Sequence, residues 1–138
     1  MQQFFEFPVH SVCTFENFIA CDGNVGALQF SLRIAATDDA ENLLYLHGPA
    51  GSGKTHLLKA IGLAMEKNGS GSVSYLSCRD TFTPDELCSR FAESPALLVD
   101  DLHLMPDNAY VRAALWQVFN DFHSVGRKIA MAGHFPPP

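Results

Sequence analysis

The sequence of 138 residues contains no apolar run near the roughly 20 residues that a membrane-spanning helix needs. Its first residues, Met1–Glu6, lack the basic start and the long apolar stretch of a secretory signal. No internal repeat is present, and the terminal Pro136–Pro138 is the one low-complexity segment. From these absences we expect a cytoplasmic protein without a membrane anchor.

Positive charge is scarce. Nine Lys and Arg residues stand against 15 Asp and Glu residues, which gives a formal net charge of −6. A surface that binds duplex nucleic acid needs several neighbouring cations to neutralise phosphates, and here the basic residues are scattered. We therefore expect no direct binding to DNA.

Cysteine is sparse and irregularly spaced. The four cysteines, Cys13, Cys21, Cys78 and Cys88, include no Cys-x-x-Cys pair. This spacing disfavours a zinc site and a disulfide framework. The expectation is that the thiols are reduced and mostly buried.

The composition, with 47% hydrophobic and 17% charged residues, is that of one globular domain. Short apolar runs predict strands at 42–47, 73–76, 96–100 and 128–132. The residue pattern predicts helices at about 24–36, from the glycine-rich segment to Gly69, and between Pro106 and Gly126. A further short helix is predicted to start at Thr83, which has the pattern of a capping box with Glu86 and is followed by Pro84. Strands that alternate with crossover helices predict a mostly parallel sheet in a three-layer α/β sandwich.

The strongest motif follows the first predicted strand. It matches the pattern G-x-x-x-x-G-K-[ST] over Gly48, Pro49, Ala50, Gly51, Ser52, Gly53, Lys54 and Thr55. Its glycines let backbone N–H groups turn toward phosphate oxygens, and the N-terminus of the next helix adds positive charge. We assign Lys54 to the β- and γ-phosphates and Thr55 to a Mg²⁺ ion. The alternative is a glycine-rich turn with a solvated lysine.

An acidic pair, Asp100 and Asp101, ends the predicted strand 96–100. In a parallel sheet this end lies at the same edge as the phosphate loop. We predict that Asp100 holds Mg²⁺ with Thr55, directly or through water, and that Asp101 orients an attacking water molecule. The alternative is that the two acids only cap the loop before Pro106.

Other candidate residues carry less information. His47, His56 and His103 flank the two motifs, but their spacing matches no metal site, so we interpret them as loop or packing residues. Trp116 lies beside the apolar stripe of its predicted helix, which leaves both partial burial and a contact surface open.

Four segments resemble the AAA+ domain of the bacterial DnaA family, and the similarity runs from about Thr14 to Pro137. The segments are 14–18, 53–58, 75–77 and 99–102. The resemblance implies a P-loop NTPase fold, binding of ATP or ADP with Mg²⁺, and a role in the initiation of chromosome replication. It also implies that the segment Phe15–Phe18 lies near the adenine base, and that Phe18 and His56 are among the nucleotide-binding residues.

The sequence also departs from this family. Cys21 stands where the family usually has Gly, and His134 stands where it usually has a polar sensor residue. The chain stops at Pro138, before the fifth strand, the arginine finger, the lid and the DNA-reading domain of complete relatives. We therefore expect residues 14–138 to form an incomplete AAA+ domain, with the first strand at the sheet edge and very slow hydrolysis of ATP.

The short length resembles the Hda-like group of DnaA-related regulators. In that group a short N-terminal motif docks on the polymerase sliding clamp, and residues 3–7 match it loosely within a tail of residues 1–13. The alternative is that this tail packs on its own domain. The resemblance implies the initiator DnaA, and possibly the clamp, as partners.

Three functions remain open from the sequence. The first is a regulatory nucleotide-binding domain that acts through protein contacts. The second is a small phosphoryl-transfer enzyme such as a kinase. A kinase needs a lid rich in Arg, but the region after Thr81 has only three arginines, and they are widely spaced: Arg90, Arg112 and Arg127. The third is a degenerate scaffold that binds no nucleotide.

Overall fold

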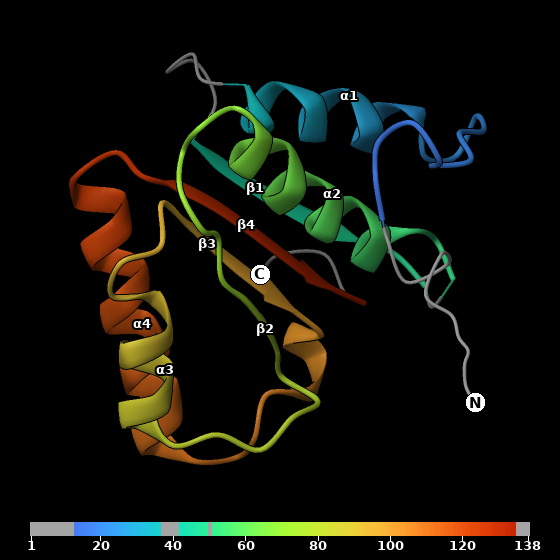
Figure 1. The fold of residues 1–138 in the computed structure, drawn as a ribbon. Helices are drawn as coiled ribbons and strands as arrows, with labels where there is room; N and C mark the ends of the chain where they lie inside the picture. Colours follow the sequence, from blue (N-terminus) through green and yellow to red (C-terminus); the bar gives the residue numbers. More distant parts are fainter. Residues whose placement is uncertain (1–12, 37–41, 50, 135–138) are drawn as a thin grey trace, which may run out of the picture.

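The computed structural model describes residues 13–36, 42–49 and 51–134. After one initial helix, strands and helices alternate along the chain (Figure 1). In chain order the elements are α1 (Val25–Ala35), β1 (Leu43–His47), α2 (Lys54–Lys67), β2 (Tyr75–Ser77), α3 (Pro84–Phe91), β3 (Ala96–Asp100), η3 (Leu102–Leu104), α4 (Ala109–Ser124) and β4 (Lys128–Gly133).

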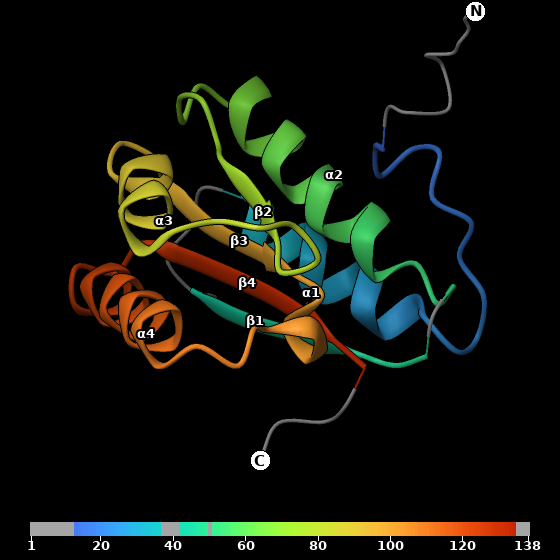
Figure 2. The same ribbon diagram turned by 90° about the horizontal axis from the view of Figure 1, so that it is seen from below.

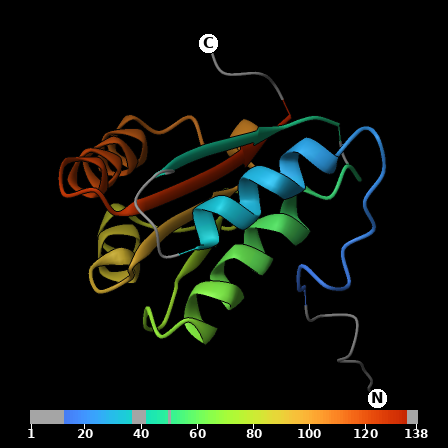
Figure 3. The same ribbon diagram turned by 90° about the horizontal axis from the view of Figure 1, so that it is seen from above.

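The four strands form one parallel sheet in the order β1-β4-β3-β2. Helices α1 and α2 cover one face of the sheet, and α3 and α4 cover the other (Figure 2). Figure 3 shows α1 and α2 side by side on their face. The predicted α/β sandwich with a parallel sheet is confirmed, and β1 lies at an edge of the sheet that the described residues form.

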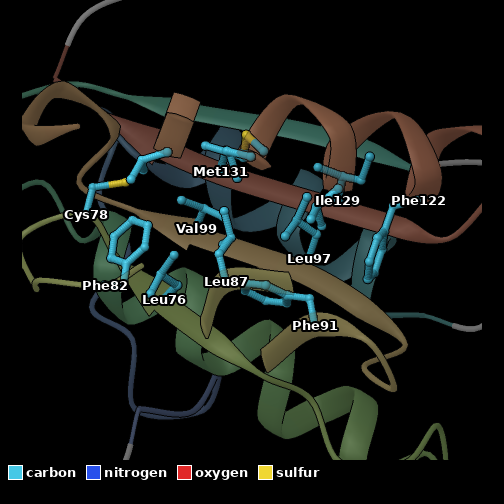
Figure 4. Packing of buried hydrophobic residues seen from close by; sticks show 13 residues of the cluster. Leu76, Cys78, Phe82, Leu87, Phe91, Leu97, Val99, Phe122, Ile129 and Met131 are labelled. Atoms are coloured by element: carbon cyan, nitrogen blue, oxygen red, sulfur yellow. The ribbon is translucent and has the colours of Figure 1, made fainter. Parts of the chain in front are cut away.

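Each face of the sheet has its own hydrophobic core. Leu97 and Val99 of β3 point into the core under α3 and α4, whereas Ala96 and Leu98 point into the core under α1 and α2. This alternation follows from the two-residue period of a strand. Figure 4 shows the first of these cores packed around Leu87 of α3. All five residues of β3 are buried, as expected for a central parallel strand.

Most element boundaries agree with the sequence prediction, and the start of β2 does not. The predicted strand 73–76 begins only at Tyr75. The N–H of Val73 donates to Glu66 Oε2 at 2.8 Å, and the N–H of Ser74 donates to Ser94 Oγ at 3.0 Å. The side chains of Glu66 and Ser94 therefore accept hydrogen bonds from backbone N–H groups that would otherwise be available to a neighbouring strand.

The prediction of mostly buried thiols is wrong. Only Cys78 is buried among the four cysteines, all of which the structure describes. Cys88 lies on the outer face of α3, one residue after the buried Leu87, and Cys21 is exposed before α1. Burial, together with the charges of Asp101 and Asp100, raises the pKa of the Cys78 thiol to about 12. Apolar packing therefore keeps this thiol protonated.

The outer face of α4 carries an exposed aromatic stack. Trp116 is 63% exposed, and its ring stacks on that of Phe119 with centroids 5.3 Å apart. The Trp116 ring is therefore mostly exposed, and a contact surface at this position stays a prediction. Among the described residues, no helix combines the length and the apolar character needed to cross a membrane.

Candidate functional site

The candidate site lies where the parallel strands end. β1 ends at His47, and the chain then turns into α2, whose N-terminus lies near the carboxyl ends of β3 and β4 (Figure 1). A pocket of about 330 Å³ opens there. It is lined by Gly51, Gly53, Lys54, Thr55, His56, Arg79, Asp101 and His134. The fold thus brings the phosphate loop together with Asp101; Ala50 lies outside the described residues.

Two glycines shape the loop. Gly51 and Gly53 have φ angles of +82° and +94°, a region in which residues with a Cβ are strained. Gly53 is also the N-cap of α2 and has no side chain that could cap the helix. The first N–H groups of α2 therefore remain available to an anion in the pocket.

The segment before α1 packs against the first turn of α2. A Cβ on Gly53 would lie 2.7 Å from Cε1 of Phe18, so this ring also requires glycine at the position. The rings of Phe18 and His56 meet edge to face at 5.3 Å. His56 Nε2 lies 2.7 Å from the carbonyl oxygen of Thr14, which ties the segment to the helix. Phe18 and His56, both predicted from the resemblance, thus lie beside the phosphate loop.

The ammonium group of Lys54 lies across the loop. It donates to the carbonyl oxygens of Gly48 at 2.7 Å and Pro49 at 2.8 Å, and to Ser52 Oγ at 3.2 Å. The lysine is therefore held by loop oxygens and does not extend into solvent. The same three protons are suited to phosphate oxygens that enter the loop.

Asp100 is buried at 1% exposure and accepts three hydrogen bonds. Its Oδ2 accepts from Thr55 Oγ1 at 2.5 Å and from the Tyr75 hydroxyl at 2.7 Å. Its Oδ1 accepts from the N–H of Asp101 at 2.8 Å. Burying a carboxylate without partners is costly, and these three donors offset part of that cost. The contact with Thr55 joins the two predicted motifs.

Tyr75 is a site residue that the sequence analysis missed. Burial, then its hydrogen bond to Asp100, raises the pKa of its hydroxyl, which therefore stays protonated as a donor. It starts β2, and the register pairs Tyr75 with Leu98 and Ser77 with Asp100. Its sequence signal is its place in segment 75–77, which resembles the DnaA family, but the role of its hydroxyl depends on β2 lying next to β3.

Asp101 has a backbone conformation of its own. Its φ is +56°, the one positive φ outside glycine in the described part of the chain. The turn directs its carboxylate toward the end of β2, where Oδ2 accepts from Ser77 Oγ at 2.6 Å. The Nε of Arg79 lies 3.8 Å from the same oxygen. Ser77 and Arg79 are two further site residues that the motif did not reveal.

Two histidines stack on each other, and one of them, His134, lines the pocket. The rings of His103 and His134 lie 3.5 Å apart with an interplanar angle of 15°. Burial first, and then the neighbouring His103 and Lys54, lower the pKa of His134, while Asp101 acts in the opposite direction. His134 therefore favours its neutral form. His103, which we interpreted as a loop or packing residue, stacks on His134, the residue at the position of the family's sensor.

The donor set at this edge is suited to a magnesium ion. Mg²⁺ prefers hard oxygen ligands and is usually held by one or two protein groups together with phosphates. The Thr55 hydroxyl and the Asp100 carboxylate supply such ligands at the end of β3. The residues therefore fit the metal that the two motifs imply.

Comparison with known proteins identifies the family. The model of the bacterial DnaA ATPase domain matches residues 9–138. The replication initiator DnaA of Pseudothermotoga lettingae is 30% identical over 94% of this chain, and that of Thermotoga petrophila is 29% identical over 94%. In both cases the alignment covers 32% of the relative, so the chain spans about a third of their length.

Solved structures agree. Domain III of Thermotoga maritima DnaA matches with a TM-score of 0.78 and 26% identity, covering 94% of this chain and 59% of that one. AMPPCP-bound DnaA from Aquifex aeolicus has the same fold, with a TM-score of 0.68 at 22% identity over 88% of this chain and 42% of that one. With a family model that matches nearly its whole length, the chain belongs to the bacterial DnaA ATPase-domain family of AAA+ proteins.

Proposed function

We propose that this chain binds ATP or ADP together with Mg²⁺ in the pocket between the phosphate loop and Asp101. The observation that carries the proposal is the 2.5 Å contact between Thr55 and the buried Asp100, beside a lysine held across the loop. The structures of DnaA relatives bound to AMPPCP, an ATP analogue, support it.

Each site residue has a role in this proposal. Lys54 exchanges its carbonyl partners for β- and γ-phosphate oxygens, and the N–H groups at the start of α2 bind the same phosphates. Thr55 and Asp100 hold Mg²⁺, which when bound offsets the negative charge of the phosphates. Phe18 and His56 lie on the side of the loop where the base is expected.

Hydrolysis is a second part of the proposal. Asp101 orients the attacking water molecule, and Lys54 stabilises the charge of the reacting phosphate. We expect turnover by this chain alone to be very slow, because Oδ2 of the Asp101 carboxylate already accepts a hydrogen bond from Ser77. Membership of the DnaA family favours this function over a small kinase.

Calorimetric titration tests nucleotide binding. Lys54→Ala should weaken the affinity for Mg·ATP by about ten- to a hundredfold, because charge-assisted hydrogen bonds to phosphate are lost. Lys67→Ala is the matched control, since this exposed lysine lies at the opposite end of α2. Equal affinity of the unaltered chain and Lys54→Ala, or no binding at millimolar nucleotide, contradicts the proposal.

We further propose a regulatory, Hda-like role in which the bound nucleotide controls a surface that meets the initiator DnaA. This rests on the family and on a net charge of −6, which disfavours direct DNA binding. Residues 3–7 are proposed to dock on the sliding clamp; they lie outside the described residues. Deleting residues 1–8 should abolish clamp binding in a pull-down with purified clamp, and unchanged binding would refute this docking.

A further inference from the structure

We propose that Arg79 is a second cation of the pocket. When ATP binds, its guanidinium moves from Asp101 to the terminal phosphate, and when ADP binds, it stays paired with Asp101. Arg79 would then be a specificity-determining residue for the triphosphate. The inference rests on the proposed nucleotide binding and adds to it a residue that lies in neither sequence motif.

The position of Arg79 supports this role. It follows β2 by two residues and lines the same pocket as Lys54 and Thr55. Its side chain is 71% exposed, so it can move toward a ligand without disturbing the core. Its guanidinium is therefore available to an anion that enters this pocket.

Ser77 holds Arg79 and Asp101 in one arrangement. Its hydroxyl oxygen accepts the backbone N–H of Arg79 at 3.1 Å and donates to Asp101 Oδ2 at 2.6 Å. Because Ser77 is only 8% exposed, this arrangement is fixed at the end of β2. The backbone of Arg79 is thus anchored while its side chain remains exposed.

The present partner of Arg79 is a weak one. Its Nε lies 3.8 Å from Asp101 Oδ2, which is an ion pair but too long for a hydrogen bond. At this distance the pair contributes little, because the Arg79 side chain is exposed to water. A phosphate offers a guanidinium two parallel charge-assisted hydrogen bonds, which are stronger. Exchange of partners is therefore favourable when a third phosphate reaches this side of the pocket.

The exchange has a consequence for Asp101. Once Arg79 binds phosphate, one Asp101 oxygen loses its cationic neighbour, while the hydrogen bond from Ser77 keeps the carboxylate oriented. That oxygen is then free to accept a hydrogen bond from the attacking water molecule. With ADP the pair remains intact. The presence of the third phosphate thus determines whether Asp101, the water-orienting residue, is paired with Arg79.

Calorimetry with the full chain tests this inference, using Mg·AMPPCP and Mg·ADP. Arg79→Gln should weaken AMPPCP binding about tenfold and change ADP binding less than twofold. Arg79→Lys should recover part of the loss, because it keeps the charge but not the planar fork. Arg112→Gln is the matched control. Arg112 is an exposed arginine of α4 that pairs with Asp107 at 2.9 Å, and its substitution should alter neither affinity.

A double-mutant cycle provides the second readout. Asp101→Asn removes the competing partner and should tighten AMPPCP binding, and this gain should disappear in the Arg79→Gln background. An unchanged ratio of AMPPCP to ADP affinity in Arg79→Gln overturns the inference, although nucleotide binding itself then stands. If the unaltered chain binds neither nucleotide, the proposed function fails and the inference fails with it.

Discussion

At the residue scale, the site depends on a buried carboxylate with three donors. Thr55, Tyr75 and the N–H of Asp101 all donate to Asp100, which is almost completely buried. Each donor offsets part of the cost of removing a charge from water. The position that we propose for magnesium is therefore held by hydrogen bonds before any ion binds.

Tyr75→Phe should lower the free energy of unfolding by about 1.5–3 kcal/mol, because a buried carboxylate loses one donor while the ring remains. Urea denaturation measures this. Tyr110→Phe is the control, since Tyr110 is 80% exposed and its hydroxyl is solvated. Equal stability of Tyr75→Phe and the unaltered chain would show that the hydrogen bond to Asp100 contributes nothing.

The sequence could predict some of these residues and not others. Lys54, Thr55, Asp100 and Asp101 belong to motifs whose chemistry is local, so their positions near one another follow from the topology of a parallel sheet. Three other site residues act through contacts with the neighbouring strand or its end: Tyr75, Ser77 and Arg79. Their roles depend on β2 lying next to β3, which no short pattern specifies.

At the element scale, strands and helices were predictable where an apolar run is uninterrupted or where a capping motif marks the start of a helix. β3 was predicted with the bounds that the structure shows, because a run of apolar residues suits a strand buried on both faces. The N-terminus of α3 was predicted from its capping box, in which Thr83 and Glu86 bond reciprocally. The start of β2 was not, because the side chains of Glu66 and Ser94 compete for its backbone.

The residue patterns could not predict the long-range packing between elements. The contact of His56 with Thr14 joins residues 42 positions apart and sets the N-terminal segment against α2. The resemblance to the DnaA family placed Phe18 near the base, and the structure adds that its ring closely approaches Gly53. Glycine at this position thus serves the loop and the segment that packs on it.

At the scale of the whole molecule, an acidic domain concentrates cations at one edge of its sheet. The net charge is −6, yet Lys54, Arg79 and the N-terminus of α2 all face one pocket. Local arrangement rather than net charge therefore decides where an anion binds. The described strands end at this edge because all of them are parallel.

The measurement that tests this account most directly is the response of the loop amides to nucleotide. On titration with Mg·ADP, the amide NMR signals of Gly51, Gly53 and Thr55 should shift and saturate, because N–H groups there bind phosphate oxygens. In Lys54→Ala the same signals should shift only at much higher concentration. If they stay unmoved in the unaltered chain at millimolar ADP, the phosphates bind elsewhere or not at all, and the central claim is wrong.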